Sequence, residues 1–196
     1  MNYLMMNIST LLIVAACGVL ISLFFNTALR WMAVLALTIL SVFIPVAGSN
    51  PWLWINGAVG EISIVTMILL IVFVVRGLAG YSLLETRART HLSILILLTG
   101  FILYPATLGL TQFDPYSLGY GFELSLLLLS LSILYWIFRQ QEVALILLFV
   151  VAAREIGILS SVNVWDYLID PLLWLFSPAI LIILSIDRRR AAKNGV

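Results

Sequence analysis

The chain has 196 residues, of which 63% are hydrophobic and 10% are charged, and its mean hydropathy is +1.17. An ordinary soluble domain carries roughly 25% charged residues, so the composition excludes that class and indicates a protein whose solvent is the lipid bilayer. A net charge of +1 disfavours nucleic acid as a partner, and the single cysteine and single histidine exclude an internal disulfide, a CxxC pair and a site built from several histidines.

Apolar segments follow one another along the whole chain with short polar gaps between them. A transmembrane helix needs about 20 mostly apolar residues, so this length predicts an all-α bundle of seven spans in a single transmembrane domain, 1–196. The first apolar stretch is long enough for two helices, and Arg30 at its middle predicts the turn between them; without that turn the bundle has six spans. In chain order the predicted spans are 8–29, 31–47, 58–76, 91–110, 122–138, 143–163 and 171–186.

Basic and acidic residues occupy alternate gaps between these spans. One set of gaps holds nine of the ten Lys and Arg residues, namely Arg30, Arg76, Arg87, Arg89, Arg139, Arg188, Arg189, Arg190 and Lys193. The other set holds six carboxylates and one basic residue, namely Glu61, Asp114, Glu123, Glu155, Asp166, Asp170 and Arg154. Because loops rich in Lys and Arg stay in the cytoplasm, the pattern predicts an N-terminus outside and a cytoplasmic C-terminus. It is typical of a multi-pass protein of the plasma membrane, and we expect the bacterial inner membrane.

Most of the outer carboxylates have a structural explanation. Glu61, Glu123 and Asp170 lie at or near predicted helix N-termini, where the helix dipole and unpaired backbone N–H groups favour negative charge. Asp170 also precedes Pro171, and Asp114 precedes Pro115, which is the usual order of a cap and the first helical residue. Ligand binding is the alternative for these residues.

Arg154 and Glu155 do not fit that explanation. If span 143–163 is helical throughout, Glu155 lies about eight residues, roughly 12 Å, inside its outer end. Charged groups at such depth usually face a bundle interior or a water-filled cavity. Adjacent helical residues point about 100° apart, so we expect each of the two to need a partner on another helix or a ligand. A structural interhelical ion pair, or a helix that ends early, is the alternative.

The leading hypothesis is a non-catalytic protein that binds or helps to translocate a small or lipid-like molecule through an outward-facing intramembrane pocket. Arg154 and Glu155 would form its floor, and kinks at three prolines within spans would help to open it, namely Pro45, Pro105 and Pro178. Candidate binding residues are Arg154, Glu155, Glu61, Glu123, Asp166, Asp170 and Trp165. The rim would be formed by Trp52, Trp54, Trp165 and Tyr120.

Two other functions remain open. The chain has no room for a domain outside the bilayer, which favours an accessory or assembly subunit that pairs with partner membrane subunits or with copies of itself. An integral enzyme acting on a lipid or lipid-linked substrate would use Glu155, Asp166 or Asp170 as a general base or metal ligand. The sequence identifies no catalytic residue, metal site or cofactor. A subunit interface predicts that Arg154 or Glu155 faces outward, whereas a pocket predicts that both face inward.

Overall fold

The computed structural model describes residues 3–22, 27–46 and 48–193, and within these ranges the chain is helical apart from its connections and one isolated bridge between Val46 and Ser49. The helices form two compact units. Unit 1 comprises Met1–Leu83 with Ile158–Ser160, and unit 2 comprises Leu84–Gly157 with Ser161–Val196.

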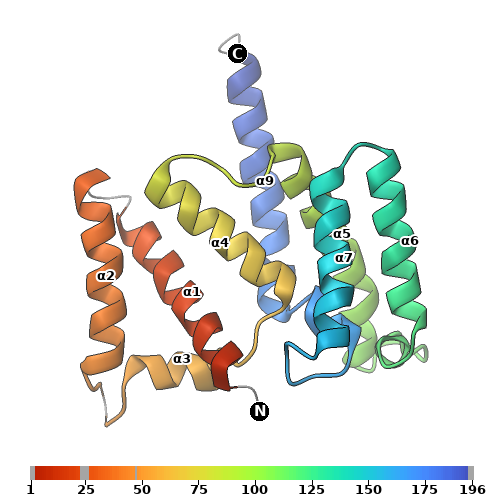
Figure 1. Cartoon of the computed structure of the whole chain (residues 1–196), viewed down its shortest axis with the longest axis horizontal. Coiled ribbons are helices and arrows are strands. Elements are labelled where there is room, and N and C mark those ends of the chain that lie inside the picture. Colours follow the sequence, from red (N-terminus) through yellow and green to blue (C-terminus); the bar gives the residue numbers. More distant parts are fainter. Residues whose placement is uncertain (1–2, 23–26, 47, 194–196) are drawn as a thin grey trace. The chain divides into compact units, whose positions relative to one another are not determined.

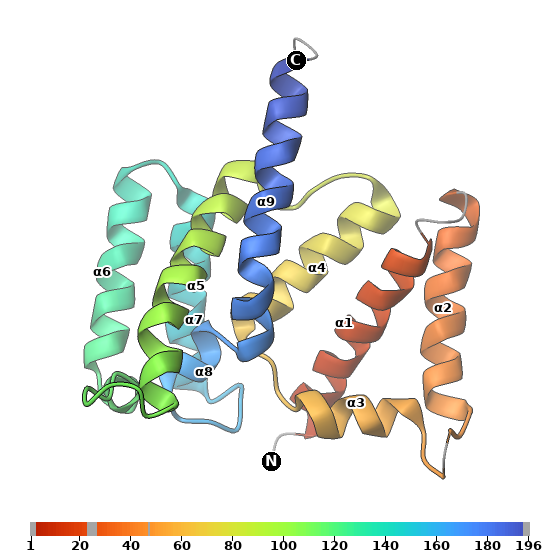
Figure 2. The same ribbon diagram turned by 180° about the vertical axis from the view of Figure 1, so that it is seen from behind.

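Unit 1 is built around α1 (Tyr3–Ser22), which packs against α2 (Thr27–Phe43) and α4 (Ile64–Ala79). The short helix α3 (Pro51–Val59) lies across the ends of α1 and α2 (Figure 2). Asn50-Pro51 starts α3 because proline is favoured at the first helical position. Ser63 caps α4 by accepting a hydrogen bond from the backbone N–H of Thr66.

The sequence analysis expected Arg30 to mark the turn between the first two spans, and this expectation is wrong. Arg30 lies inside α2, because that helix already begins at Thr27. The two predicted spans are nevertheless separate helices, since α1 ends at Ser22 and α2 begins at Thr27, and residues 23–26 lie outside the described part of the chain. Pro45 follows the end of α2 at Phe43, so it kinks no helix.

Unit 2 contains α5 (Thr86–Thr107), α6 (Glu123–Ile137), α7 (Gln141–Ile156) and α9 (Pro171–Lys193), with the short helices η1 (Tyr116–Gly119) and α8 (Val164–Leu168) between them. Pairs form between α6 and α7 and between α5 and α9 (Figures 1 and 2). The core of the unit centres on α7, whose buried residues are Val143, Ala144, Ile146, Leu147, Val150, Val151 and Ala153.

Close packing joins α5 to α9. Gly100 has no side chain where the indole of Trp174 passes, and a Cβ there would overlap the ring. Pro178 inside α9 deprives the Trp174 carbonyl of its helical N–H donor. The hydroxyl of Ser177 donates to that carbonyl at 2.8 Å and replaces the lost bond. The hydrogen bond lost at Pro178 is therefore replaced within α9 itself.

Within the described residues, three helices are long and apolar enough to cross a membrane, namely α1, α5 and α9. The other apolar helices, α2, α4, α6 and α7, have 17, 16, 15 and 16 residues. At 1.5 Å per residue they extend over about 22 to 26 Å, which is less than the roughly 30 Å of a typical hydrocarbon core.

Candidate functional site

The helix that carries Arg154 and Glu155 ends much earlier than predicted. α7 stops at Ile156 because Gly157 adopts a left-handed conformation with φ of 72°, and its N–H caps the carbonyls of Ala153 and Arg154. Glycine tolerates this conformation without steric cost, which makes it the usual helix terminator. Arg154 and Glu155 therefore lie in the last turn of α7, and the predicted depth of about 12 Å is wrong.

Arg154 forms hydrogen bonds with three other residues of unit 2. Its Nη1 donates to Oε1 of Glu155 at 2.7 Å, Nη2 donates to the carbonyl of Tyr120 at 3.2 Å, and Nε donates to the carbonyl of Val162 at 3.1 Å. The expectation that adjacent residues could not satisfy each other is thus wrong, because the long arginine side chain reaches sideways at a helix end. The guanidinium joins the end of α7 to the loops before α6 and before α8.

Glu155 is the exposed member of the pair. Its side chain is 59% exposed, against 22% for Arg154. Among the described residues, its hydrogen-bonded contact is the one to Arg154. Glu155 therefore presents most of its carboxylate at the surface of unit 2, whereas the Arg154 guanidinium is held by the protein itself.

A second group of polar residues lies at the same end of unit 2, in the connecting segments that contain η1 and α8, and we call it the loop cluster: Tyr116, Ser161, Asn163, Trp165 and Asp166. Asp166 accepts hydrogen bonds from the phenol of Tyr116, at 3.0 and 3.1 Å, and from the hydroxyl of Ser161. Asn163 is fully buried; its side chain accepts from the Trp165 N–H at 2.9 Å and donates to the Tyr116 carbonyl at 3.0 Å. Burial, reinforced by the bond to Asp166, holds the pKa of Tyr116 well above its usual value.

Trp165 lies inside unit 2 and not at the rim of a pocket. Its side chain is buried, and the indole N–H donates to the carbonyl of Pro115 at 2.8 Å. The loop 111–121 is thereby fixed to α8. Trp54 and Tyr120, in contrast, have exposed side chains.

Two carboxylates occupy helix N-termini as the sequence predicts. Glu123 is exposed in the first turn of α6. Asp170 precedes α9, and its Oδ1 accepts from the backbone N–H of Leu173 at 2.9 Å. Asp114 lies one residue before Pro115, the N-cap of η1, and its Oδ1 accepts from the N–H of Tyr116 at 3.0 Å. These positions agree with the structural explanation given above.

Glu61 belongs to unit 1, where it binds the segment Ile158–Ser160. Its two carboxylate oxygens accept from the N–H of Ser160 at 2.7 Å and from the hydroxyl of Ser160 at 2.8 Å. Ser160 therefore binds both carboxylate oxygens of Glu61. Of the seven candidate residues, the structure brings Arg154 and Glu155 together and places Asp166 and Trp165 in one cluster.

Unit 1 contains a polar group that the sequence analysis missed, here called the amide cluster: Asn7, Thr10, Trp52 and Asn56. Asn7 accepts from the Trp52 indole at 3.2 Å and from the Asn56 amide at 3.1 Å, and Thr10 donates to Asn56. One signal was available, since Asn7 and Thr10 are three residues apart in an apolar helix and therefore share a face. Polar side chains in such helices usually bind across to a neighbour.

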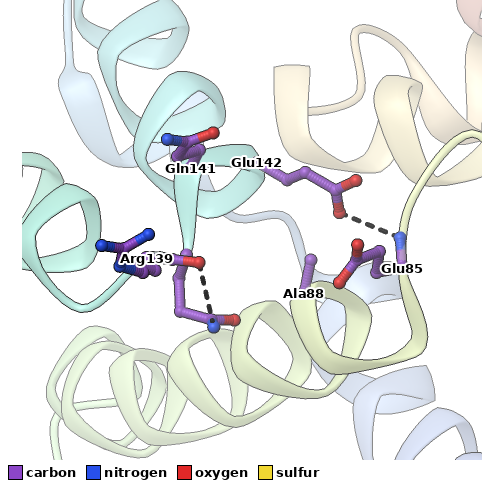
Figure 3. Close-up of a pocket in the computed structure, with 6 residues that line it drawn as sticks. Glu85, Ala88, Arg139, Gln141 and Glu142 are labelled. Carbon is purple, nitrogen blue, oxygen red and sulfur yellow. Dashed lines mark hydrogen bonds between the residues drawn. The ribbon is translucent and has the colours of Figure 1, made fainter.

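A cavity of about 160 Å³ lies at the other end of α7 from Arg154, lined by Glu85, Ala88, Arg139, Gln140, Gln141 and Glu142. Glu142 reaches from the start of α7 to the start of α5, where it accepts from the backbone N–H of Glu85 at 2.9 Å (Figure 3). Pockets for small molecules usually measure about 300 to 1,000 Å³, so this cavity is too small for a substrate of that size.

The described residues contain no group of three or more His, Cys, Asp or Glu side chains that could hold a metal ion. No protein-family model matches the chain, and no curated protein and no solved structure matches it either.

Proposed function

We propose that this chain is a multi-pass membrane protein that acts as a non-catalytic subunit of a larger membrane complex, with Glu155 at the surface that meets a partner. The observation that carries the proposal is the exposure of Glu155 beside an arginine that is already hydrogen-bonded. A ligand-binding pocket would instead need the Arg154 guanidinium to be available to the ligand.

The exposed helix surface supports the same proposal. Only 17% of the apolar part of α9 is buried within the chain, and only 28% of the apolar part of α5 is buried. α9 exposes Leu175, Phe176, Ile182 and Ile183, each more than half accessible. Lipid, partner helices or both must cover such surfaces, because water does so only at a large free-energy cost.

Seven crossings with the N-terminus outside remain part of the proposal. Within unit 2 one end carries six arginines together with Glu85, Glu142 and Asp187, and the other end carries five carboxylates together with Arg154. The six arginines are Arg87, Arg89, Arg139, Arg188, Arg189 and Arg190, and the five carboxylates are Asp114, Glu123, Glu155, Asp166 and Asp170. This separation fits a unit that crosses the bilayer with its basic end in the cytoplasm. The four shorter helices would require local thinning of the bilayer or interfacial anchoring of their ends.

Cysteine labelling tests the topology. In a Cys17→Ser background, a cysteine at Ser82 and one at Thr111 fall in predicted inner and outer loops. A membrane-impermeant maleimide added to intact cells should label Thr111→Cys and reach Ser82→Cys only after permeabilisation. Equal labelling of both positions in intact cells would contradict the orientation.

Native mass spectrometry of the complex purified from its own membrane in mild detergent tests the subunit role. We expect stoichiometric partner chains with the unmodified protein and their loss with Glu155→Lys. Glu123→Lys is the matched control, because it reverses another exposed carboxylate at the same end of unit 2. A lone chain that carries a small molecule or lipid in stoichiometric amount would instead favour the binding or translocation function.

A further inference from the structure

The basic end of the α5–α9 pair combines an arginine group with exposed aliphatic surface. Arg188 of α9 donates from Nη2 to the hydroxyl of Thr90 on α5 at 2.9 Å, which fixes the end of one helix against the start of the other. Arg87 on α5 and Arg189 and Arg190 on α9 are exposed. We call these four residues the arginine group: Arg87, Arg188, Arg189 and Arg190.

The helical conformation of α9 determines how the arginines are presented. α9 continues as a helix past Ile186 and through the arginine run to Lys193. Consecutive helical residues point about 100° apart, so Arg188, Arg189 and Arg190 project in three directions around one helix end. Partial negative charge at a helix C-terminus favours cations there, and the exposed side chains of Arg189 and Arg190 can reach an anion while Arg188 also binds Thr90.

Apolar surface lies one to two turns below the arginines on the same helix. Ile182, Ile183 and Ile186 are 59%, 56% and 42% exposed. On α5, Ile94 is 43% exposed one turn beyond Thr90. A soluble anion has no apolar part that could contact this surface. A lipid can place its acyl chains on these isoleucines and its headgroup at the level of the arginines.

We infer that the arginine group and the adjacent aliphatic surface of α5 and α9 form a binding site for anionic phospholipids. The arginines bind the phosphate of the headgroup, and the exposed isoleucines contact the acyl chains. Asp187 and Glu85 are the carboxylates nearest in sequence to the group, so positive charge predominates there by four residues to two. The inference depends on the membrane crossing by α9 and not on a partner subunit.

The test is lipid binding to the purified chain, measured by native mass spectrometry with phosphatidylglycerol and phosphatidylcholine of identical acyl chains. Each basic residue near an anionic surface contributes roughly 1 kcal/mol, which is about a fivefold change in affinity. The unmodified chain should therefore prefer phosphatidylglycerol, and Arg189→Gln with Arg190→Gln should weaken that binding about 25-fold. Arg189→Lys with Arg190→Lys should keep most of the preference.

Arg139→Gln is the matched control, because Arg139 is an exposed arginine of unit 2 outside the arginine group. Equal binding of the two lipids by the unmodified chain would overturn the inference, as would an equal loss in Arg139→Gln. Displacement of the lipid by inorganic phosphate, beyond the effect of chloride at the same ionic strength, would also overturn it in favour of a free-anion site. The lipid test uses the isolated chain, so a negative result in it does not contradict the subunit proposal. Loss of partner chains in the test of the subunit role does not contradict the lipid site.

Discussion

The amide cluster of unit 1 and the loop cluster of unit 2 both consist of hydrogen-bonded polar side chains, but the groups that these side chains bind differ. In unit 1, neutral side chains on the regular helices α1 and α3 bind one another, as Asn7 does to Trp52 and Asn56. In unit 2, side chains bind the carbonyls and N–H groups of the short helices η1 and α8 in the connecting segments, as Asn163 does to the backbone of Tyr116 and Trp165. Loop backbone needs such partners because a buried N–H or carbonyl without one is costly.

The difference indicates where each unit is sensitive to substitution. Helices in unit 1 satisfy their own backbone groups, so the loss of one amide there removes only a side-chain contact. The loops of unit 2 depend on particular side chains for their backbone hydrogen bonds. We therefore expect unequal effects from chemically identical substitutions in the two clusters.

The largest expected difference is between Asn163→Ala and Asn56→Ala. Asn163→Ala leaves the buried N–H of Trp165 without its partner and removes one hydrogen bond to the carbonyl of Tyr116, and the free energy of unfolding should fall by about 3 kcal/mol. Asn56 is only partly buried, and its loss should cost about 1 kcal/mol. Reversible unfolding in mixed detergent micelles measures both. Equal losses would contradict the distinction between the clusters.

Two glycine substitutions should have opposite effects. Gly100→Ala forces a methyl group against the Trp174 ring and should destabilise the α5–α9 pair by about 2 kcal/mol. Gly57→Ala in α3 meets no atom within 4 Å and should stabilise that helix by about 0.5 kcal/mol. Trp174→Phe should partly rescue Gly100→Ala in a double-mutant cycle of unfolding free energies. Strict additivity of the two changes would refute this contact.

Alkaline unfolding should report on Tyr116. Because its pKa is higher in the folded protein than in the unfolded chain, its stabilising effect is complete below about pH 10 and is lost as the pH rises through the folded pKa. The unmodified protein should therefore lose stability above pH 10 more steeply than Tyr116→Phe. At neutral pH the variant should be about 1 to 2 kcal/mol less stable, because it lacks the hydrogen bond to Asp166. Identical alkaline slopes would show that this phenol is not linked to folding.

The smallest expected effect on stability is that of Glu155→Gln. An exposed ion pair contributes at most about 1 kcal/mol, so unfolding of the isolated chain should change by less than that amount. Arg154→Gln should cost more, because the guanidinium also binds the carbonyls of Tyr120 and Val162. If Glu155→Gln proved the more damaging of the two, the carboxylate would have a structural role that its exposure does not explain.

Runs of apolar residues predicted where the helices lie, but not where they end. The apolar segments located α1, α2, α4, α5, α6, α7 and α9 because a run of apolar residues is a strong and local signal. The end of α7 was missed although Arg154 and Gly157 form a familiar C-terminal pattern of a basic last turn followed by glycine. α3 was assigned to a connection although Asn50-Pro51 is a helix start.

The contacts of the loop cluster could not be predicted from the sequence. The hydrogen bond between Tyr116 and Asp166 joins residues 50 positions apart, and nothing local in either segment specifies the other. The same applies to Glu61 and Ser160, which are 99 positions apart. Helix caps such as Asp170 were predictable because the donor and the acceptor lie within one turn of each other.

The central claim is that Glu155 meets a partner chain, and photo-crosslinking in intact membranes tests it most directly. A photoreactive amino acid placed at position 155 should give one discrete adduct, whose second component is the subunit that co-purifies in stoichiometric amount, and the same residue at position 123 should not. Adducts with lipid alone, or an equal yield from both positions, would contradict the account.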